Sequence, residues 1–155
     1  MAADIWAAGV GRLFMLRVYA LLIVMRGVIT IGTMQSITKR LGTPMRETST
    51  DGVSRDQVRF ARRVGRAIAR LADKTPTNSN CYPQALTAWW LLHRKGIPTT
   101  FYYGAKFDKN RSGLETHVWL RCGPLIVTGG GVHLHYKPMT WFADESVESR
   151  GPSPS

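Results

Sequence analysis

The spacing of apolar residues predicts helices over the first two thirds of the chain. Apolar positions recur every three or four residues from Asp4 to about Thr33, and again from Arg55 to about Ala72. Ser54 and Gln57 form a capping-box pair at the start of the second of these segments. Two more helices are predicted, a short one over residues 35–41 and one from Cys81 to Lys95, which ends at a glycine. Residues 43–53, between these helices, are rich in turn-forming residues and are expected to form a linker.

The period changes after Pro98, where alternating and β-branched residues predict strands. The expected strands cover residues 100–107, 116–122, 125–128 and 132–136, with a short segment at 138–142, and 108–113 is expected to form a turn. Helices followed by an antiparallel meander are typical of an α+β fold.

Length and composition indicate one globular domain. The chain has 155 residues, of which 44% are hydrophobic and 20% charged, and this is enough to form a hydrophobic core. We expect a single domain over residues 1–144, with a helical part at 1–72 and a cysteine-bearing helix plus sheet at 78–142. Residues 145–155 are polar and are expected to be a disordered tail.

The charge of the chain indicates an anionic partner. Lys and Arg total 21 against 10 acidic residues, which gives a formal net charge of +11. Nucleic acid, a membrane surface and an acidic peptide or protein all fit this charge. The helix at 55–72 carries six arginines, but Phe60 is its only aromatic residue, so a solvated face is favoured over a specific nucleic-acid site.

The N-terminal segment is apolar but interrupted by arginines. Arg17 and Arg26 bound an uncharged run of eight residues, which is shorter than the ~20 residues that a bilayer-spanning helix needs. A core helix or helix pair is therefore expected over Leu13 to Met34, and contact with a membrane surface is the less favoured alternative.

Two cysteines, Cys81 and Cys122, are too few for a disulfide framework and form no CxxC pair. A reducing cytoplasm is therefore the expected location. His133 and His135 share one face of an expected strand, but no third ligand accompanies them. Neither a metal nor an organic cofactor is predicted.

Cys81 and His117 are the candidate catalytic residues. Cys81 falls in the first turn of its helix, where free N–H groups and the helix dipole favour a thiolate. His117 begins a predicted strand, whereas His93 lies at the far end of the cysteine's own helix, ~18 Å away at 1.5 Å per residue. A cysteine and a histidine in such positions are also common as structural residues. The residues alone therefore leave catalytic and structural roles open.

Two stretches of the sequence resemble the transglutaminase-like cysteine peptidases that mature lasso peptides, the B-type leader peptidases. They are NCYPQALTAWWLLHRKGIPTTFYYGAKF, which begins at Asn80, and ETHVWLRCGPLIVTGG, which begins at Glu115. The matching features are the cysteine at the helix start, the Gly-Ile-Pro run at 96–98, and the His-Val-Trp-Leu strand that begins at His117. The resemblance is close over residues 78–130 and loose over 5–142.

This resemblance implies a papain/transglutaminase-like fold and a specific activity. The thiolate of Cys81 would cut the leader from a lasso precursor peptide, with His117 moving the proton. A small leader-recognition protein would bring the precursor, because the segment before Cys81 is helical and leaves no room for a strand-bearing recognition module. A separate ATP-dependent macrolactam cyclase would close the ring, in a bacterial cytoplasm.

One position departs from the family pattern. Many members carry an aspartate about a dozen residues after the histidine, and Gly129 stands there in this chain. Asp144, Thr128 or a backbone carbonyl are the alternatives for orienting the imidazole. The departure also keeps two further possibilities open, a non-catalytic module that binds a peptide or partner and a transglutaminase acting on glutamine side chains.

Overall fold

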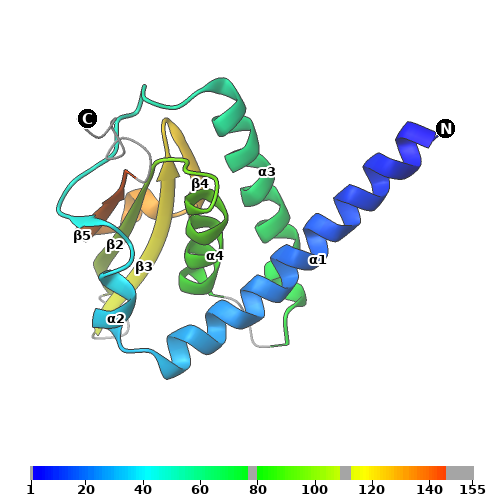
Figure 1. Ribbon diagram of the computed structural model, residues 1–155. Helices are drawn as coiled ribbons and strands as arrows, with labels where there is room; N and C mark the ends of the chain where they lie inside the picture. Colours follow the sequence, from blue (N-terminus) through cyan, green and yellow to red (C-terminus); the bar gives the residue numbers. More distant parts are fainter. Residues whose placement is uncertain (1, 77–79, 109–112, 146–155) are drawn as a thin grey trace, which may run out of the picture.

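A computed structural model of the protein describes residues 2–76, 80–108 and 113–145, with side chains of the first helix described from Gly11 onward. One antiparallel sheet carries helices on one face, and the N-terminal helix crosses beside them (Figure 1). This arrangement confirms the α+β class and is consistent with the papain/transglutaminase-like fold that the resemblance implies. Residues 109–112 of the predicted turn at 108–113, and residues 146–155 of the predicted tail at 145–155, lie outside the described residues.

The helices follow the periodicity of the sequence closely. Their bounds are Ala2–Ile31 (α1), Met34–Thr38 (α2), Arg55–Leu71 (α3) and Cys81–His93 (α4). A short 3-10 helix, η1, covers Ala72–Lys74 directly after α3. Both hydrogen bonds of the predicted capping box are present. Gln57 N–H donates to Ser54 Oγ over 3.2 Å, and Ser54 N–H donates to Gln57 Oε1 over 2.8 Å. These local signals therefore define the start of α3.

The sheet has five strands in the order β1-β5-β2-β3-β4. Their bounds are Thr43–Pro44 (β1), Thr99–Asp108 (β2), Gly113–Cys122 (β3), Leu125–Thr128 (β4) and Lys137–Asp144 (β5). Strands β2, β3 and β4 form the predicted meander, but β5 returns to pair with the free edge of β2. The expectation of a plain meander is therefore wrong for the last strand.

Two further expectations are corrected by the structure. Residues 132–136 do not form a strand, because a 3-10 turn, η2, covers His133–His135. Residues 43–53 are not a free linker, because β1 pairs with β5 and the chain after β1 is bound to the sheet. The buried Arg121 holds this segment by donating to Thr48 O over 2.8 Å, and it also donates to Gly123 O over 2.8 Å.

The two faces of the sheet bury different sets of side chains. Val118, Leu120 and Cys122 of β3 face the helices and belong to the main core with α1, α3 and α4. The alternate β3 residue Trp119 lies on the other face, in a smaller cluster with Tyr102 and Tyr136. Because side chains alternate along a strand, His117 shares the face of Trp119.

Only one side of α1 contributes to the core. Val18, Leu22 and Met25 are buried against the rest of the protein, as expected of a core helix. The outer side is apolar but exposed, with Leu13 69% and Ile31 89% accessible. The stretch Gly11–Ile31 is long and apolar enough to cross a membrane by length and composition, a criterion that core helices and signal sequences also meet.

Candidate active site

Cys81 is the first residue of α4, as the sequence predicts. Asn80 precedes it in an extended conformation, and the Asn80 side chain makes no capping hydrogen bond. Pro83, in the first turn, has no N–H group. The backbone N–H groups of Cys81 and Tyr82, at the start of α4, have no intrahelical acceptor, and no acceptor for them is found among the described residues. They provide donors beside the thiol for the negative charge of a thiolate or an oxyanion.

The two cysteines have different surroundings. Cys81 is half-buried, at the border of the main core. Cys122 is fully buried in that core, and burial raises the pKa of its thiol to about 11. Of the two, Cys81 is the one with access to a substrate.

His117 lies in an aromatic cluster at the start of the buried part of β3. Its ring centroid is 4.9 Å from that of Tyr136 and 5.9 Å from that of Trp119. Its Nε2 lies 2.9 Å from the carbonyl oxygen of Gly129. Because a carbonyl only accepts hydrogen bonds, Nε2 carries the hydrogen, and in the neutral ring the lone pair is left on Nδ1. This tautomer suits a general base that works through Nδ1.

Gly129 therefore occupies the place of the missing aspartate with a backbone acceptor. Its φ is +74°, and an added Cβ would lie 2.9 Å from His117 Nε2 and 2.7 Å from Val118 O. A side chain at this position would collide with the imidazole in the present backbone conformation. Of the three alternatives considered for orienting His117, the carbonyl is the one with a hydrogen bond to the ring.

Asp144, the acidic alternative, has a different partner. Its Oδ2 lies 2.7 Å from Nδ1 of His93, at the opposite end of α4 from Cys81. The hydroxyl of Thr128 is buried and has no hydrogen-bond partner among the described residues. Neither side chain orients His117 in this structure.

No hydrogen bond joins Cys81 to His117 among the described residues, although the lengths of helix and strand put the two at about the same level of the sheet. The end of α4 is fixed at the start of β2, because His93 bonds Asp144 and Asp144 pairs with Thr99. A helix of 13 residues is ~20 Å long, which matches about six residues of β2 and brings Cys81 level with the Gly104–His117 pair. In the described part of the chain, no hydrogen bond joins Sγ of Cys81 to the His117 ring, whose side chain belongs to the face opposite α4.

Two further groups, Glu115 and Tyr136, lie beside His117 in the structure. Glu115 lies two residues earlier on the same face of β3, accepts a hydrogen bond from the Tyr136 hydroxyl and pairs with Lys106 over 3.3 Å. The Glu115 hydrogen bond is the main cause that raises the pKa of Tyr136. A carboxylate thus contacts the aromatic ring that lies over the imidazole. Strand alternation places Glu115 on this face, but only the structure brings in Tyr136.

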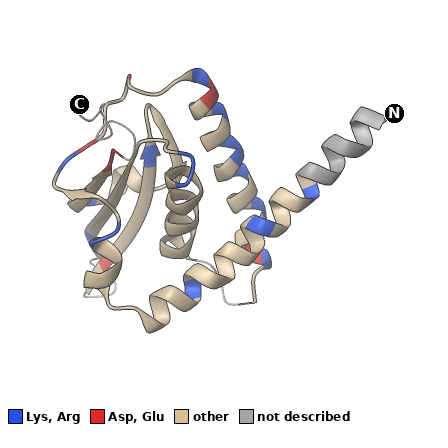
Figure 2. Ribbon diagram, viewed as in Figure 1, with Lys and Arg blue, Asp and Glu red and all other residues tan. Residues whose placement is uncertain are grey.

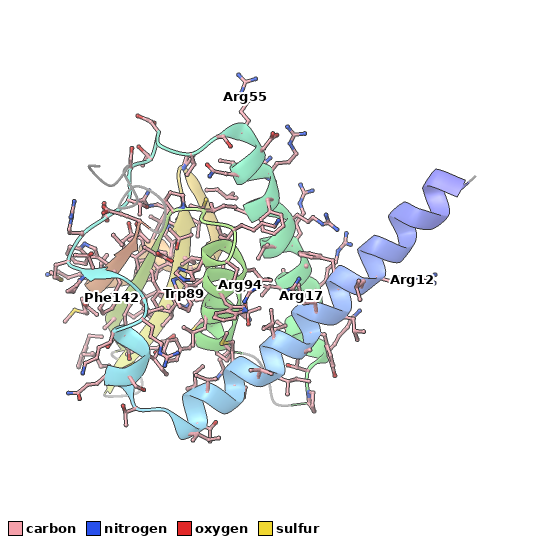
Figure 3. All side chains as sticks on the ribbon, in the orientation of Figure 1. Arg12, Arg17, Arg55, Trp89, Arg94 and Phe142 are labelled. Carbon is pink, nitrogen blue, oxygen red and sulfur yellow. The ribbon has the colours of Figure 1, made fainter. Side chains whose placement is uncertain are left out.

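A small apolar cavity opens beside the nucleophile's neighbour, Tyr82. It measures about 200 Å³, and Met34, Phe101 and Phe142 contribute to its wall. The Tyr82 hydroxyl donates to Met34 Sδ over 3.0 Å, and burial raises the Tyr82 pKa to about 12. The phenol therefore stays neutral, and the cavity suits an apolar side chain. In Figure 3, Phe142 lies on the sheet and Trp89 on α4.

Two of the remaining histidines, His133 and His135, do not lie on the strand that the sequence predicts for them. His133 and His135 lie in η2, where His133 Nδ1 bonds Gly130 O over 2.7 Å. Among the described residues no three His, Cys, Asp or Glu side chains gather as metal ligands.

Comparison with known families agrees with the fold. The model of the transglutaminase-like superfamily matches residues 21–140, which is well over half of the 155-residue chain. No curated protein and no solved structure matches the chain. This superfamily includes cysteine peptidases. The chain therefore belongs to the transglutaminase-like superfamily.

Proposed function

We propose that this protein is a cysteine peptidase that removes the leader from a lasso precursor peptide in the cytoplasm. It would work with a small leader-recognition protein and an ATP-dependent macrolactam cyclase. The observation that carries the peptidase chemistry is the position of Cys81 at the open start of α4. The lasso-peptide substrate rests on the sequence resemblance over residues 78–130.

The proposed reaction uses three groups of this chain. The Cys81 thiolate attacks the scissile carbonyl carbon, and the oxyanion that forms accepts hydrogen bonds from the N–H groups at the start of α4. His117 takes the thiol proton on Nδ1 and gives it to the leaving amine, which releases the core peptide. Water then hydrolyses the thioester, so that the leader leaves as a carboxylic acid and the thiol is restored.

This mechanism requires a hydrogen bond between Cys81 Sγ and His117 Nδ1, and the described residues show His117 bonded only to Gly129 O. Catalytic hydrogen bonds are often absent before substrate binds and form only in the complex. Substrate seated beside Tyr82 would contact the same end of the sheet as His117.

A non-catalytic binding module is the alternative. The placement of His117 on the face away from α4 favours it, as does the glycine at the position of the family's aspartate. Such a module would hold the precursor peptide without cutting it.

Mass spectrometry of the cleavage products tests the proposal. A lasso precursor peptide would be incubated with the protein and its candidate leader-recognition partner. Cys81→Ala, His117→Ala and Cys122→Ala would be compared with the unmodified protein. Cys122→Ala is the matched control, because it removes the buried thiol and keeps Cys81.

The peptidase predicts one cut at the leader–core junction that Cys81→Ala and His117→Ala abolish and Cys122→Ala preserves. A leader peptide that has gained the elements of water, together with free core peptide, identifies hydrolysis of the peptide bond. In transglutamination a glutamine side chain would instead acylate the thiol with release of ammonia, and an amine would then take up the acyl group. Binding of the precursor without any cut, in all four proteins, would leave the binding module as the function.

A further inference from the structure

A groove between α1 and α3 carries an unusual concentration of arginine. It is open to solvent and has a volume of about 1110 Å³. Six arginines line it, and we refer to it as the arginine groove: Arg12, Arg59, Arg62, Arg63, Arg66 and Arg70. Figure 2 shows the basic residues following one another along α3, and Figure 3 shows Arg12 and Arg17 on α1.

The floor of the arginine groove is apolar. Phe14 of α1 and Phe60 of α3 meet there edge to face, with ring centroids 6.3 Å apart. Met15 and Leu71 extend this surface along the two helices. The guanidinium carbon of Arg63 lies 4.4 Å from the centroid of the Phe14 ring, in a cation–π contact at the edge of this floor, and Arg63 as a whole is exposed.

The charges around the groove are almost unopposed. Among the residues whose side chains the structure describes, Asp56 is the single acidic residue that lines the groove, and its carboxylate pairs with Arg59 over 2.7 Å. Uncompensated like charges on one face repel each other, and an anionic partner relieves that repulsion. An apolar floor inside a basic rim is complementary to a ligand with an apolar face and acidic edges.

The spacing of the arginines fits a helical partner. Arg59, Arg63, Arg66 and Arg70 follow one another at four, three and four residues, so they form a single row along α3 over ~16 Å. Carboxylates at the same spacing on a second helix would face this row. The apolar side of the partner helix would then contact Phe14 and Phe60, and its axis would lie at the distance usual between packed helices.

We infer that the arginine groove binds an acidic amphipathic peptide helix of a partner molecule. A flat bilayer would contact the convex outer side of α1 rather than the floor between two helices. The inference concerns a surface made by α1 and α3 and does not depend on the proposed peptidase chemistry of Cys81 and His117.

Fluorescence anisotropy with a synthetic peptide tests the inference. The probe is a fluorescein-labelled 18-residue peptide with leucine at every third and fourth position and glutamate elsewhere. A scrambled peptide of the same composition and a peptide with lysine in place of glutamate serve as ligand controls. Binding to vesicles of zwitterionic lipid with and without anionic lipid is measured by sedimentation.

Two triple variants separate the groove from overall charge. Arg59→Glu, Arg63→Glu and Arg66→Glu reverse the row, whereas Lys39→Glu, Arg40→Glu and Lys137→Glu remove the same charge from exposed residues outside it. The row variant should bind the glutamate peptide at least tenfold more weakly. Each exposed ion pair contributes only modestly to the binding free energy, but three of them are lost together. It should also gain binding of the lysine peptide, which a misfolded protein could not do. The other variant should bind as the unmodified protein does.

Other outcomes would overturn the inference. Equal weakening in both variants would indicate a general charge effect, and equal binding of the scrambled peptide would remove the requirement for an amphipathic helix. Binding to anionic vesicles without binding of the glutamate peptide would assign this charge to a membrane surface.

Discussion

The carbonyl of Gly129 holds His117 only because residue 129 has no side chain, and the substitution Gly129→Ala tests this relationship. The φ of +74° lies in the left-handed region, which costs a residue with a Cβ roughly 1–2 kcal/mol. The added Cβ would also lie 2.7 Å from Val118 O and 2.8 Å from Trp119 Cβ, two atoms that the sheet fixes in place. Together we expect the free energy of unfolding to fall by about 3 kcal/mol.

Gly131→Ala is the matched control. Gly131 has no atom within 4 Å of an added Cβ and does not have a left-handed φ. Both substitutions reduce the entropy of the unfolded chain equally, so their difference isolates strain and contact at residue 129.

Thermal unfolding followed by circular dichroism measures this difference. For a domain of this size 1 kcal/mol shifts the melting temperature by roughly 2–4 °C, so Gly129→Ala should melt about 6–12 °C below Gly131→Ala. The ¹⁵N spectrum of His117 adds a local readout, since the unmodified protein should carry its ring hydrogen on Nε2. Equal melting temperatures for the two variants, or a ring hydrogen on Nδ1 in the unmodified protein, would refute the role assigned to Gly129.

Three further predictions follow from contacts elsewhere in the fold. Iodoacetamide at pH 7.5 should alkylate Cys81 well before Cys122. Burial raises the pKa of Cys122 to about 11, so its thiol stays protonated until the pH approaches that value. Comparable alkylation rates of the two cysteines, measured by peptide mapping, would contradict the difference in burial. Asp144→Asn should lower the free energy of unfolding by about 1–3 kcal/mol in urea titrations, since it weakens the 2.7 Å bond to His93. The same variant should leave alkylation of Cys81 unchanged, whereas a slower rate would place Asp144 in the site after all. Arg121→Met should cost about 3 kcal/mol or more in the same titration, because the carbonyls that accept from its guanidinium lose their donor; a cost below 1 kcal/mol would mean that water replaces the guanidinium.

The helices were predictable because their signals are local. The capping box of α3 needs only Ser54 and Gln57, and the start of α4 needs only the residues around Cys81. The place of β5 was not predictable from such patterns. Its pairing with β2 joins Thr99 to Asp144, and nothing in the sequence near either residue specifies this partner.

The candidate site divides in the same way. The position of Cys81 at a helix start could be predicted from the sequence, and so could that of His117 on a strand. The partner of His117 could not, because a backbone carbonyl has no sequence signature and Gly129 resembles a simple chain break. Asp144 seemed available as an orienting acid until the fold placed it against His93, 51 residues away along the chain.

The position of β5 has a consequence for the order in which the protein is made. β5 lies between β1, which follows α2, and β2, so the last strand to be synthesised joins one of the first to the rest of the sheet. Until the ribosome has released β5, β1 has no strand to pair with and one edge of β2 is unpaired. The segment that follows β1 then lacks the β1–β5 pairing beside it. Nascent chains with unpaired strand edges and exposed apolar helices are the species most prone to aggregate. During synthesis, an incomplete sheet therefore coexists with the exposed apolar side of α1 until residue 144 has been made. We expect the yield of folded protein to depend on the supply of chaperones and on the rate of translation.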